Sequence, residues 1–231
     1  QIADDTLDYN SELKLFGKEC ERVATDEIKG ILEREVFLGK KYNNLSKTQK
    51  KRLLRSKMII TEKFKNGIFE RLKARLVALG NTQDRSEYTK RQLSSPTPSA
   101  AVVLLQATVA AAKNRTVKTF DVGQAFLNSQ MTENEVNMVL EKEVAETLIK
   151  INPVYQQFLR KDGTIVVELK KALYGIVEAP RLWHDTLSAY LFSKGFKRSE
   201  LDECYYIKPL DKGKMIDITI HVDDGKVTSD D

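Results

Sequence analysis

The stretch Met215-Ile216-Asp217-Ile218-Thr219-Ile220-His221-Val222-Asp223-Asp224 decides the fold. Apolar and polar residues alternate along it, and such alternation predicts a half-buried β-strand because successive side chains point to opposite faces of a sheet. Its core-facing side chains are expected to be Ile216, Ile218, Ile220 and Val222. Two aspartates follow at once, where an ordinary buried strand would not end on bare carboxylates. The stretch therefore predicts a sheet with a charged site at the end of one strand.

A second strand ends on an acid in the same way. β-branched and aromatic residues dominate residues 116–121, which predicts a strand that closes on Asp121. If the two strand ends lie side by side, Asp121, Asp223 and Asp224 converge and repel one another unless a cation neutralises them. Hard divalent ions with oxygen ligands are the natural partners. Taken singly, Asp223-Asp224 is also compatible with a simple turn and Asp121 with a helix N-cap, so both interpretations stay open at this point.

Local signals predict the elements around these strands. Asn66-Gly67 between two apolar runs predicts a tight, basic β-hairpin over residues 58–78. Ser99 is a natural N-cap for a helix over 100–113, which is apolar nearly all round and expected to be buried. We also expect a helix over 25–38, a strand over 164–169, and two strands, 204–207 and 215–222, as the last elements. A helix from Ala179 to a stop at Gly195 is expected to pack with one face formed by Leu182, Trp183, Thr186, Leu187, Tyr190 and Leu191.

The positive charge is concentrated in one segment. The net charge is +5, but residues 51–93 alone sum to +8 and residues 176–231 to −3. Clustered lysine and arginine bind phosphates with a gain in free energy from released counterions, which favours a nucleic-acid surface. A solvated surface, or a nuclear-import signal near Lys50-Lys51-Arg52, explains the same composition, which does not choose between these interpretations.

Composition also limits the class of protein. A chain of 231 residues is long enough for one large domain or two small ones, each with a buried core. Its most apolar run, residues 100–112, is too short for a transmembrane helix, and the beginning of the sequence lacks a secretory signal. Two cysteines and two histidines give neither a disulfide framework nor metal-ligand spacing. A reducing, intracellular compartment is expected.

Seven motifs in chain order resemble the reverse transcriptase of copia-type (Ty1/copia) LTR retrotransposons, over roughly residues 55–231. They are Lys73-Ala74-Arg75-Leu76-Val77-Ala78-x-Gly80-x-x-Gln83; Ser95-Pro96-Thr97; Asp121-Val122-x-x-Ala125-Phe126-Leu127; Leu169-Lys170-Lys171-Ala172-Leu173-Tyr174-Gly175-x-x-x-Ala179-Pro180-Arg181-x-Trp183; Gly195-Phe196; Asp202-x-Cys204; and Val222-Asp223-Asp224.

The resemblance implies an α+β fold made of reverse-transcriptase fingers and palm, the palm being an antiparallel sheet backed by helices. It implies an N-terminal helical extension over 1–50 and a reverse transcriptase domain over 51–231. Within that domain, the fingers are expected at 51–93 and 129–172, and the palm at 94–128 and 173–231. A thumb and an RNase H domain follow in complete enzymes. The sequence ends seven residues after Asp224, so a fragment of a polyprotein is expected.

The resemblance also implies a role for each matching residue. Asp121, Asp223 and Asp224 would be catalytic and would bind the metal together with the backbone carbonyl of Val122. Phe126 would be the aromatic gate that rejects a 2′-hydroxyl, although a core phenylalanine fits the sequence equally well. The nucleotide-binding residues would be Lys73, Arg75, Gly123, Gln124, Ala125, Phe126, Tyr174 and Gly175. The nucleic-acid-binding residues would be Lys63, Lys65 and His221. Arg181 and Trp183 are interpreted as structural.

Two positions depart from the family pattern. His221 stands where most members carry tyrosine or phenylalanine, and Gln124 replaces a usual asparagine or lysine. His221 shares the polar face of its strand with Asp217 and Thr219, where it is expected to touch the primer.

The implied activity is RNA-directed DNA polymerisation with two Mg²⁺ or Mn²⁺ ions. Its partners would be an RNA or DNA template-primer, deoxynucleoside triphosphates (dNTPs) and other Pol polyprotein domains (protease, integrase and RNase H), with no membrane. Cytoplasmic virus-like particles are the expected location, and the nucleus is an option. Two alternatives stay open: a truncated, inactive nucleic-acid-binding remnant, and another two-metal enzyme such as a nuclease. Triphosphate binding would separate the nuclease from the polymerase.

Overall fold

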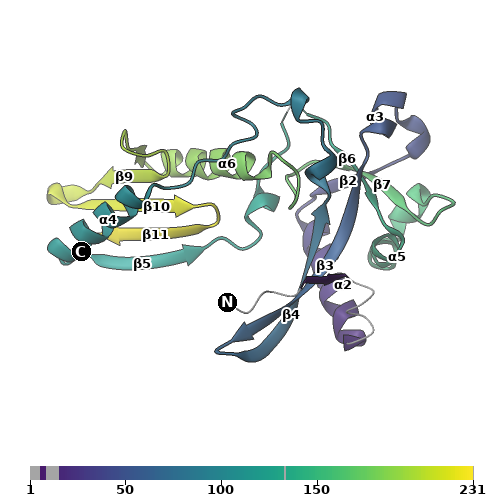
Figure 1. The fold of residues 1–231 in the computed structure, drawn as a ribbon, viewed down its shortest axis with the longest axis horizontal. Helices are drawn as coiled ribbons and strands as arrows, with labels where there is room; N and C mark the ends of the chain where they lie inside the picture. The colour runs from purple at the N-terminus through teal and green to yellow at the C-terminus, as the bar shows by residue number, and fades with distance from the viewer. Residues whose placement is uncertain (1–5, 9–15, 133, 231) are drawn as a thin grey trace. The chain divides into compact units, whose positions relative to one another are not determined.

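The computed structural model describes residues 6–8, 16–132 and 134–230. It divides into two compact units, one built from residues 1–87 and 130–179 and the other from residues 88–129 and 180–231 (Figure 1). Each unit combines one sheet with helices. The α+β class predicted from the sequence is therefore confirmed. The two units are called the first and the second unit below.

The first unit contains a six-stranded sheet in the order β1-β3-β6-β7-β2, with β4 paired to the other side of β3. Only β3 and β6 pair in parallel; the other described pairs in this sheet are antiparallel. The strands are β1 (Thr6–Asp8), β2 (Phe37–Lys40), β3 (Leu54–Lys65), β4 (Ile68–Ala78), β6 (Asn137–Leu140) and β7 (Ile165–Leu169). The α-helices are α2 (Lys18–Glu33), α3 (Lys47–Lys51) and α5 (Lys142–Ile151), and 3-10 helices include η1 (Tyr42–Asn44) and η5 (Pro153–Phe158).

The predicted hairpin is present as β3 and β4. Asn66 and Gly67 both adopt positive φ, 54° and 77°. Two successive positive φ values define the tight turn that matches the twist of paired strands, which is why Asn-Gly is favoured there. The hairpin buries one face, including Met58, Ile60 and Leu76. Its opposite face is left for the cationic side chains.

The helix expected over residues 25–38 begins and ends earlier than predicted. α2 covers Lys18–Glu33, and Phe37 and Leu38 belong to strand β2. Glu35 at φ 52° breaks the helix, and Phe37 is then buried in the sheet. Tertiary pairing of β2 with β7 therefore overrides the helical periodicity of this stretch.

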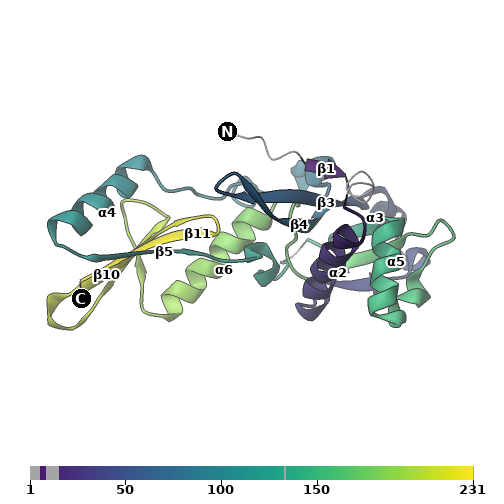
Figure 2. The same ribbon diagram turned by 90° about the horizontal axis from the view of Figure 1, so that it is seen from below.

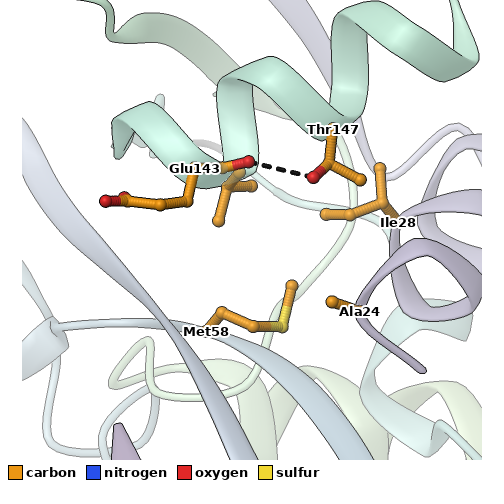
Figure 3. A pocket seen from close by; sticks show the side chains of 6 residues that line it. Ala24, Ile28, Met58, Glu143 and Thr147 are labelled. Carbon is orange, nitrogen blue, oxygen red and sulfur yellow. Dashed lines mark hydrogen bonds between the residues drawn. The ribbon is translucent and has the colours of Figure 1, made fainter. Parts of the chain in front are cut away.

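α2 and α5 pack on the sheet around a small apolar cavity lined by Ala24, Ile28, Met58, Glu143, Val144 and Thr147 (Figure 3). The Thr147 hydroxyl donates to the Glu143 carbonyl, 2.9 Å away, and so has its partner within the helix. The cavity measures about 10 Å³, near the minimum for one water molecule. It is a small packing gap rather than a ligand site.

The second unit contains a five-stranded antiparallel sheet in the order β5-β11-β10-β9-β8. Its strands are β5 (Thr116–Asp121), β8 (Lys197–Arg198), β9 (Tyr205–Pro209), β10 (Met215–His221) and β11 (Asp224–Ser229), and its α-helices are α4 (Ala100–Ala112) and α6 (Ala179–Ser193). The sequence predicted β9 and β10 as the last strands, which was wrong: β11 follows and lies between β5 and β10. Val222, expected in the strand, lies in the β10–β11 turn at φ 57°.

α6 covers one face of this sheet. Trp183, Leu187 and Leu191 pack against Ile218 and Ile220 of β10. The helix ends as predicted at Gly195, whose φ is 84°. The N–H groups of Gly195 and Phe196 donate to the carbonyls of Phe192 and Leu191, at 3.0 and 3.1 Å, which forms a Schellman motif. Tyr190, predicted on the core face, is instead 57% exposed because it lies at the edge of the packed stripe.

α4 covers the opposite face of the same sheet (Figure 2). Ser99 caps it as predicted, its hydroxyl accepting from the Val102 N–H. The prediction that the helix is buried all round was wrong, because its buried residues are Val102, Gln106 and Ala110, a single stripe. Leu104 is 66% exposed. Only one side of α4 meets the sheet, and the stripe there is partly polar because it faces the polar side of β10.

Candidate active site

Three aspartates meet at one end of the second sheet. Asp121, the last residue of β5, lies directly opposite Asp224, the first residue of β11. Asp224 is also opposite His221 at the end of β10. Directly opposed residues in antiparallel strands project from the same face, with Cβ atoms about 5 Å apart. Asp121, Asp224 and His221 therefore share one face, and Asp223 occupies the turn beside them.

Two hydrogen bonds fix the turn that carries Asp223. The indole Nε1 of Trp183 donates to the carbonyl of Val222 at 2.7 Å. The backbone N–H of Val122 donates to the carbonyl of Asp223 at 2.9 Å. Trp183 is buried. This one residue of α6 therefore stabilises Val222 in its left-handed backbone conformation. The sequence identified Trp183 as a core anchor but gave no sign that it positions the turn.

The aspartates are gathered but do not form a ready ligand set. In the described parts of the chain, no three histidine, cysteine, aspartate or glutamate side chains form a group that could hold a metal ion. Asp121 and Asp224 are exposed and Asp223 is half-buried, so their side chains have room to rotate. Their chemistry nevertheless fits a divalent cation, because carboxylate oxygens are the ligands that hard ions prefer.

A hollow of about 470 Å³ opens beside Asp121, His221 and Asp224. Its other lining residues are Pro98, Val103, Thr119, Phe120, Thr219, Gly225 and Lys226. Gly225 is required by packing, since a Cβ there would lie 2.1 Å from the ring of Phe120. Acidic groups on the wall of a hollow give a place where a charged ligand and its counter-ion could bind.

The segment after Asp121 turns sharply into a short 3-10 helix, η4 (Ala125–Asn128). Gln124 adopts the left-handed conformation, with φ 53° and ψ 40°. The Asn128 side chain donates to the carbonyl of Ala125 at 3.2 Å, which stabilises the turn. Space beside Gly123 is open. Phe126 is half-buried and packs against the core cluster of α6 and β10. It is therefore a packing residue that is also partly exposed, five positions after Asp121.

In the first unit, the hairpin presents its cations on one face. Lys73 lies opposite Thr61, Arg75 opposite Ile59, and Lys63 opposite Arg71. Because side chains two residues apart project from the same face, Lys63, Arg71, Lys73 and Arg75 share that face. Lys65 lies beyond a register shift at the tip of the hairpin, opposite Ile68.

Tyr174 and Gly175 are attached to the end of the same hairpin. The Ala78 N–H donates to the Tyr174 carbonyl at 2.8 Å, and the Arg75 guanidinium lies 5.6 Å from the centre of the Tyr174 ring. A Cβ on Gly80 would lie 2.1 Å from the Gly175 carbonyl. Two motifs that are about a hundred residues apart in sequence therefore meet through backbone contact that only glycine permits.

The predicted nucleotide-binding residues thus form two groups. Arg75, Tyr174 and Gly175 come together in the first unit, and Lys73 shares the hairpin face of Arg75. Residues 123–126 belong to the second unit, together with the three aspartates.

Sequence reasoning missed a buried polar network beneath α4. The Arg115 guanidinium donates to Asp217 and to Asp230, each at 2.7 Å. Asp217 also accepts from the Gln106 amide at 2.7 Å and from the Thr228 hydroxyl at 2.8 Å. Burial and the Asp217 carboxylate raise the pKa of Tyr205 to about 12. Alternation placed Asp217 on a polar face, but only the packing of α4 shows that this face is buried.

None of the helices in the described ranges combines the length and the apolar character needed to cross a membrane.

Comparison with known proteins gives a family match over most of the chain. The family model described as "Reverse transcriptase (RNA-dependent DNA polymerase)" matches residues 39–231. The chain is 31% identical over 175 residues to the Retrovirus-related Pol polyprotein from transposon RE1 of Arabidopsis thaliana, which covers 75% of this chain and 11% of that protein. It is 27% identical over 161 residues to the Retrovirus-related Pol polyprotein from transposon TNT 1-94 of Nicotiana tabacum, with 70% and 11% covered.

A third relative is the Truncated transposon Ty1-A Gag-Pol polyprotein of Saccharomyces cerevisiae, 24% identical over 221 residues, with 96% of this chain and 16% of that protein covered. The match to this chain thus spans between 11% and 16% of the length of these three relatives.

Proposed function

Because this chain belongs to the reverse transcriptase (RNA-dependent DNA polymerase) family, we propose that it adds deoxynucleotides to the 3′-OH of a primer, directed by an RNA or DNA template, with release of pyrophosphate. The observation that supports this most directly is the cross-strand pairing of Asp121 with Asp224 beside the Asp223 turn. Its test is the replacement of Asp223, with which the Discussion begins.

Reverse transcriptases as a family use divalent metal ions; the finer proposal is two Mg²⁺ ions, or Mn²⁺ in their place. Asp121, Asp223 and Asp224 would hold them, together with the Val122 carbonyl. When bound, such ions lower the pKa of the primer hydroxyl and stabilise charge on the triphosphate. The chain's own contribution is positional: Trp183 and the Val122 N–H hold the turn, so that the carboxylate of Asp223 starts from a fixed backbone.

In this proposal the second unit is the palm and the first unit the fingers. Helix α2 and strand β2, which precede residue 51, would then belong with the fingers, because β2 pairs with β7 and α2 packs against β4. The relatives are named as Pol or Gag-Pol polyproteins. Protease, integrase and RNase H domains are therefore the proposed partners, and a virus-like particle in the cytoplasm is the proposed location.

Replacing both Lys73 and Arg75 with alanine is expected to weaken dNTP binding more than binding of a primer–template duplex. A hydrogen bond to a charged group contributes about 1.5–3 kcal/mol, so losing two phosphate contacts should raise the dNTP dissociation constant by roughly a hundredfold or more. Equilibrium titration of the chain with labelled dNTP and Mn²⁺ measures this.

The matched control removes Lys63 and Arg71, two cations on the same face of the same hairpin. If this control weakens dNTP binding as much, general positive charge is responsible. If the Lys73/Arg75 variant loses only duplex affinity, these two residues belong to the template track instead.

Phe126→Val is expected to retain DNA synthesis but to incorporate ribonucleotides far better relative to deoxynucleotides. A ring beside the sugar leaves no room for a 2′-hydroxyl, and discrimination through such a clash can exceed the roughly 10–200-fold available from one methylene. Primer extension with paired ribo- and deoxynucleotides, in a Pol polyprotein that carries this sequence, gives the selectivity ratio.

Phe196→Val is the control, because Phe196 is another half-buried phenylalanine packed against the same core cluster and does not line the hollow beside the aspartates. We expect it to lower the melting temperature and leave sugar selectivity unchanged. If Phe126→Val behaves like Phe196→Val, then Phe126 is a core residue and the gate assignment is wrong.

A further inference from the structure

Besides the hollow beside the aspartates of the second unit, a larger hollow lies in the first unit. It is formed by residues other than those proposed for catalysis. It measures about 710 Å³ and lies between η1 and the connection from η5 to β7. Its lining residues come from two stretches, 41–44 and 157–162. Both stretches belong to one compact unit, so the shape of the hollow does not depend on how the two units are arranged.

The floor of this hollow is held rigidly by packing. The ring of Phe158 lies directly on the backbone of β2, where a Cβ on Gly39 would be 2.4 Å from it. The Tyr155 ring contacts Phe158 in a tilted arrangement, at 6.0 Å between centroids. Tyr155 is itself buried and packs edge-on against Phe37. A series of edge-on and tilted ring contacts therefore connects the core to the lining of the hollow.

Arg160, on the wall, is fixed in its conformation. Its guanidinium donates to the Thr164 hydroxyl at 2.8 Å and pairs with Asp162 at 3.1 Å. It also lies 4.4 Å from the centre of the Tyr42 ring, which Lys50 contacts as well, at 4.8 Å. A side chain that is already ordered loses little conformational entropy when it binds a ligand. The hollow thus has a pre-organised cation rather than only mobile surface lysines.

The charged residues on the lining of the hollow are three cations and one acid. Lys41 and Lys161 are exposed on its lining, where Asp162 is the one acid among the lining residues. Residues 36–61, which contain η1 and α3, include eight lysines and arginines and no aspartate or glutamate. Three of these cations, Lys40, Arg52 and Arg55, pair with glutamates outside the stretch. Lys41 and Lys161 on the lining, and Lys50 on the Tyr42 ring, lie beside a pre-organised arginine and favour a polyanionic ligand.

We propose that this hollow binds single-stranded RNA or DNA, with Lys41, Arg160 and Lys161 on its phosphates. Single strands are bound by positive grooves that also offer apolar and aromatic surface to the bases. Leu159, which is 38% exposed, and the half-buried rings of Phe158 and Tyr42 supply that surface here. A duplex hides its base faces and would gain nothing from it. The site rests on the proposed function only in that the ligand is a nucleic acid; it involves none of the three aspartates.

The test compares two triple variants of the whole chain. Lys41→Gln, Arg160→Gln and Lys161→Gln remove the cations of the hollow. Lys18→Gln, Lys29→Gln and Lys150→Gln remove three exposed lysines on α2 and α5 of the same unit. Fluorescence anisotropy with a labelled single strand of about 16 nucleotides is recorded over a range of salt concentrations, with the melting temperature of each variant measured alongside.

We expect the hollow variant to weaken single-strand binding and to reduce the magnitude of the log K–log salt slope by about two, since each phosphate contact to a single strand contributes about 0.7. The loss should be the same for oligo(dT) and oligo(dA), because phosphates carry no sequence. The α2–α5 variant should leave the slope within experimental error. Arg160→Lys should show a partial loss, because lysine keeps the charge but not the planar contact with Tyr42.

Three results would overturn the proposal: an equal loss in both triple variants, no loss in the hollow variant at an unchanged melting temperature, or an equal loss for a duplex of the same length. Activity of the Asp223→Asn variant is measured separately. If the hollow variant binds like the wild type while Asp223→Asn abolishes nucleotide addition, then this site is refuted and the polymerase proposal stands.

Discussion

Asp223→Asn is expected to abolish templated nucleotide addition, with a loss of at least about a thousandfold in rate. A bound metal ion contributes several kcal/mol of charge stabilisation in the transition state, and each 1.36 kcal/mol is a factor of ten, so losing a carboxylate that would hold the ion should be severe. Asparagine has nearly the same shape, so the turn held by Trp183 should survive. Primer extension on a homopolymer template, in a Pol polyprotein that carries this sequence, measures the rate.

The effect of Asp223→Asn on metal binding can also be measured with this chain alone, as a change in its stability. Mn²⁺ that binds the folded state should raise its stability by about 2.7 kcal/mol at a hundred times the dissociation constant, and Asp223→Asn should remove most of that gain. Asp211→Asn is the control, because Asp211 is also an aspartate in a turn of the second unit, between β9 and β10. A similar Mn²⁺ effect in all three proteins would argue against the metal site, and an active Asp223→Asn enzyme would exclude the proposed chemistry.

Arg115→Met is expected to destabilise the second unit by about 3–5 kcal/mol. The side chains of Arg115 and Asp217 are each only 2% exposed, and removing one member of a buried pair leaves the other as an uncompensated charge. Urea unfolding followed by circular dichroism measures the free energy. Fluorescence of Trp183, the one tryptophan in the sequence, reports on this unit in particular.

Arg22→Met is the matched control. Arg22 also pairs with two carboxylates, Glu19 and Asp26, but its side chain is 59% exposed. Exposed pairs contribute about 0–1 kcal/mol, so this variant should unfold nearly like the wild type. The double variant Arg115→Met/Asp217→Leu should regain part of the lost stability, because it no longer buries a lone carboxylate. An Arg115→Met protein as stable as Arg22→Met would show that the network does not stabilise the unit.

The elements that the sequence identified correctly are those with local causes. The Asn66-Gly67 turn, the Ser99 cap and the Gly195 stop each depend on backbone preferences of one or two residues. The alternation of β10 has a local cause as well, since the period of a strand is a property of its backbone. Such features are the same in any tertiary context and can therefore be read from the chain.

The features that the sequence left undetermined depend on contacts between distant segments. The exposure of Leu104 could not be read from α4, because an apolar helix does not reveal how many of its sides meet a partner. Strand β11 was missed because its polar residues, Lys226 and Thr228 among them, become a strand through pairing with β5 and β10. The helix predicted through residue 38 ends at Glu33, and Phe37 and Leu38 form part of a strand, again because of pairing with a distant segment, strand β7.

The sequence by itself determined the family, the hairpin, and the acids that follow the alternating strand and the strand before Asp121, because motifs and strand period are read directly from the chain. The tertiary structure alone decided that Asp121 pairs with Asp224, that Trp183 holds the turn of Asp223, and that Gly80 contacts Gly175. It alone decided that Asp217 is buried with Arg115. Strand register and residue burial depend on which faces of the sheets and helices meet. The free energy of those contacts is shared among residues far apart in the chain, so no single stretch of sequence reveals it.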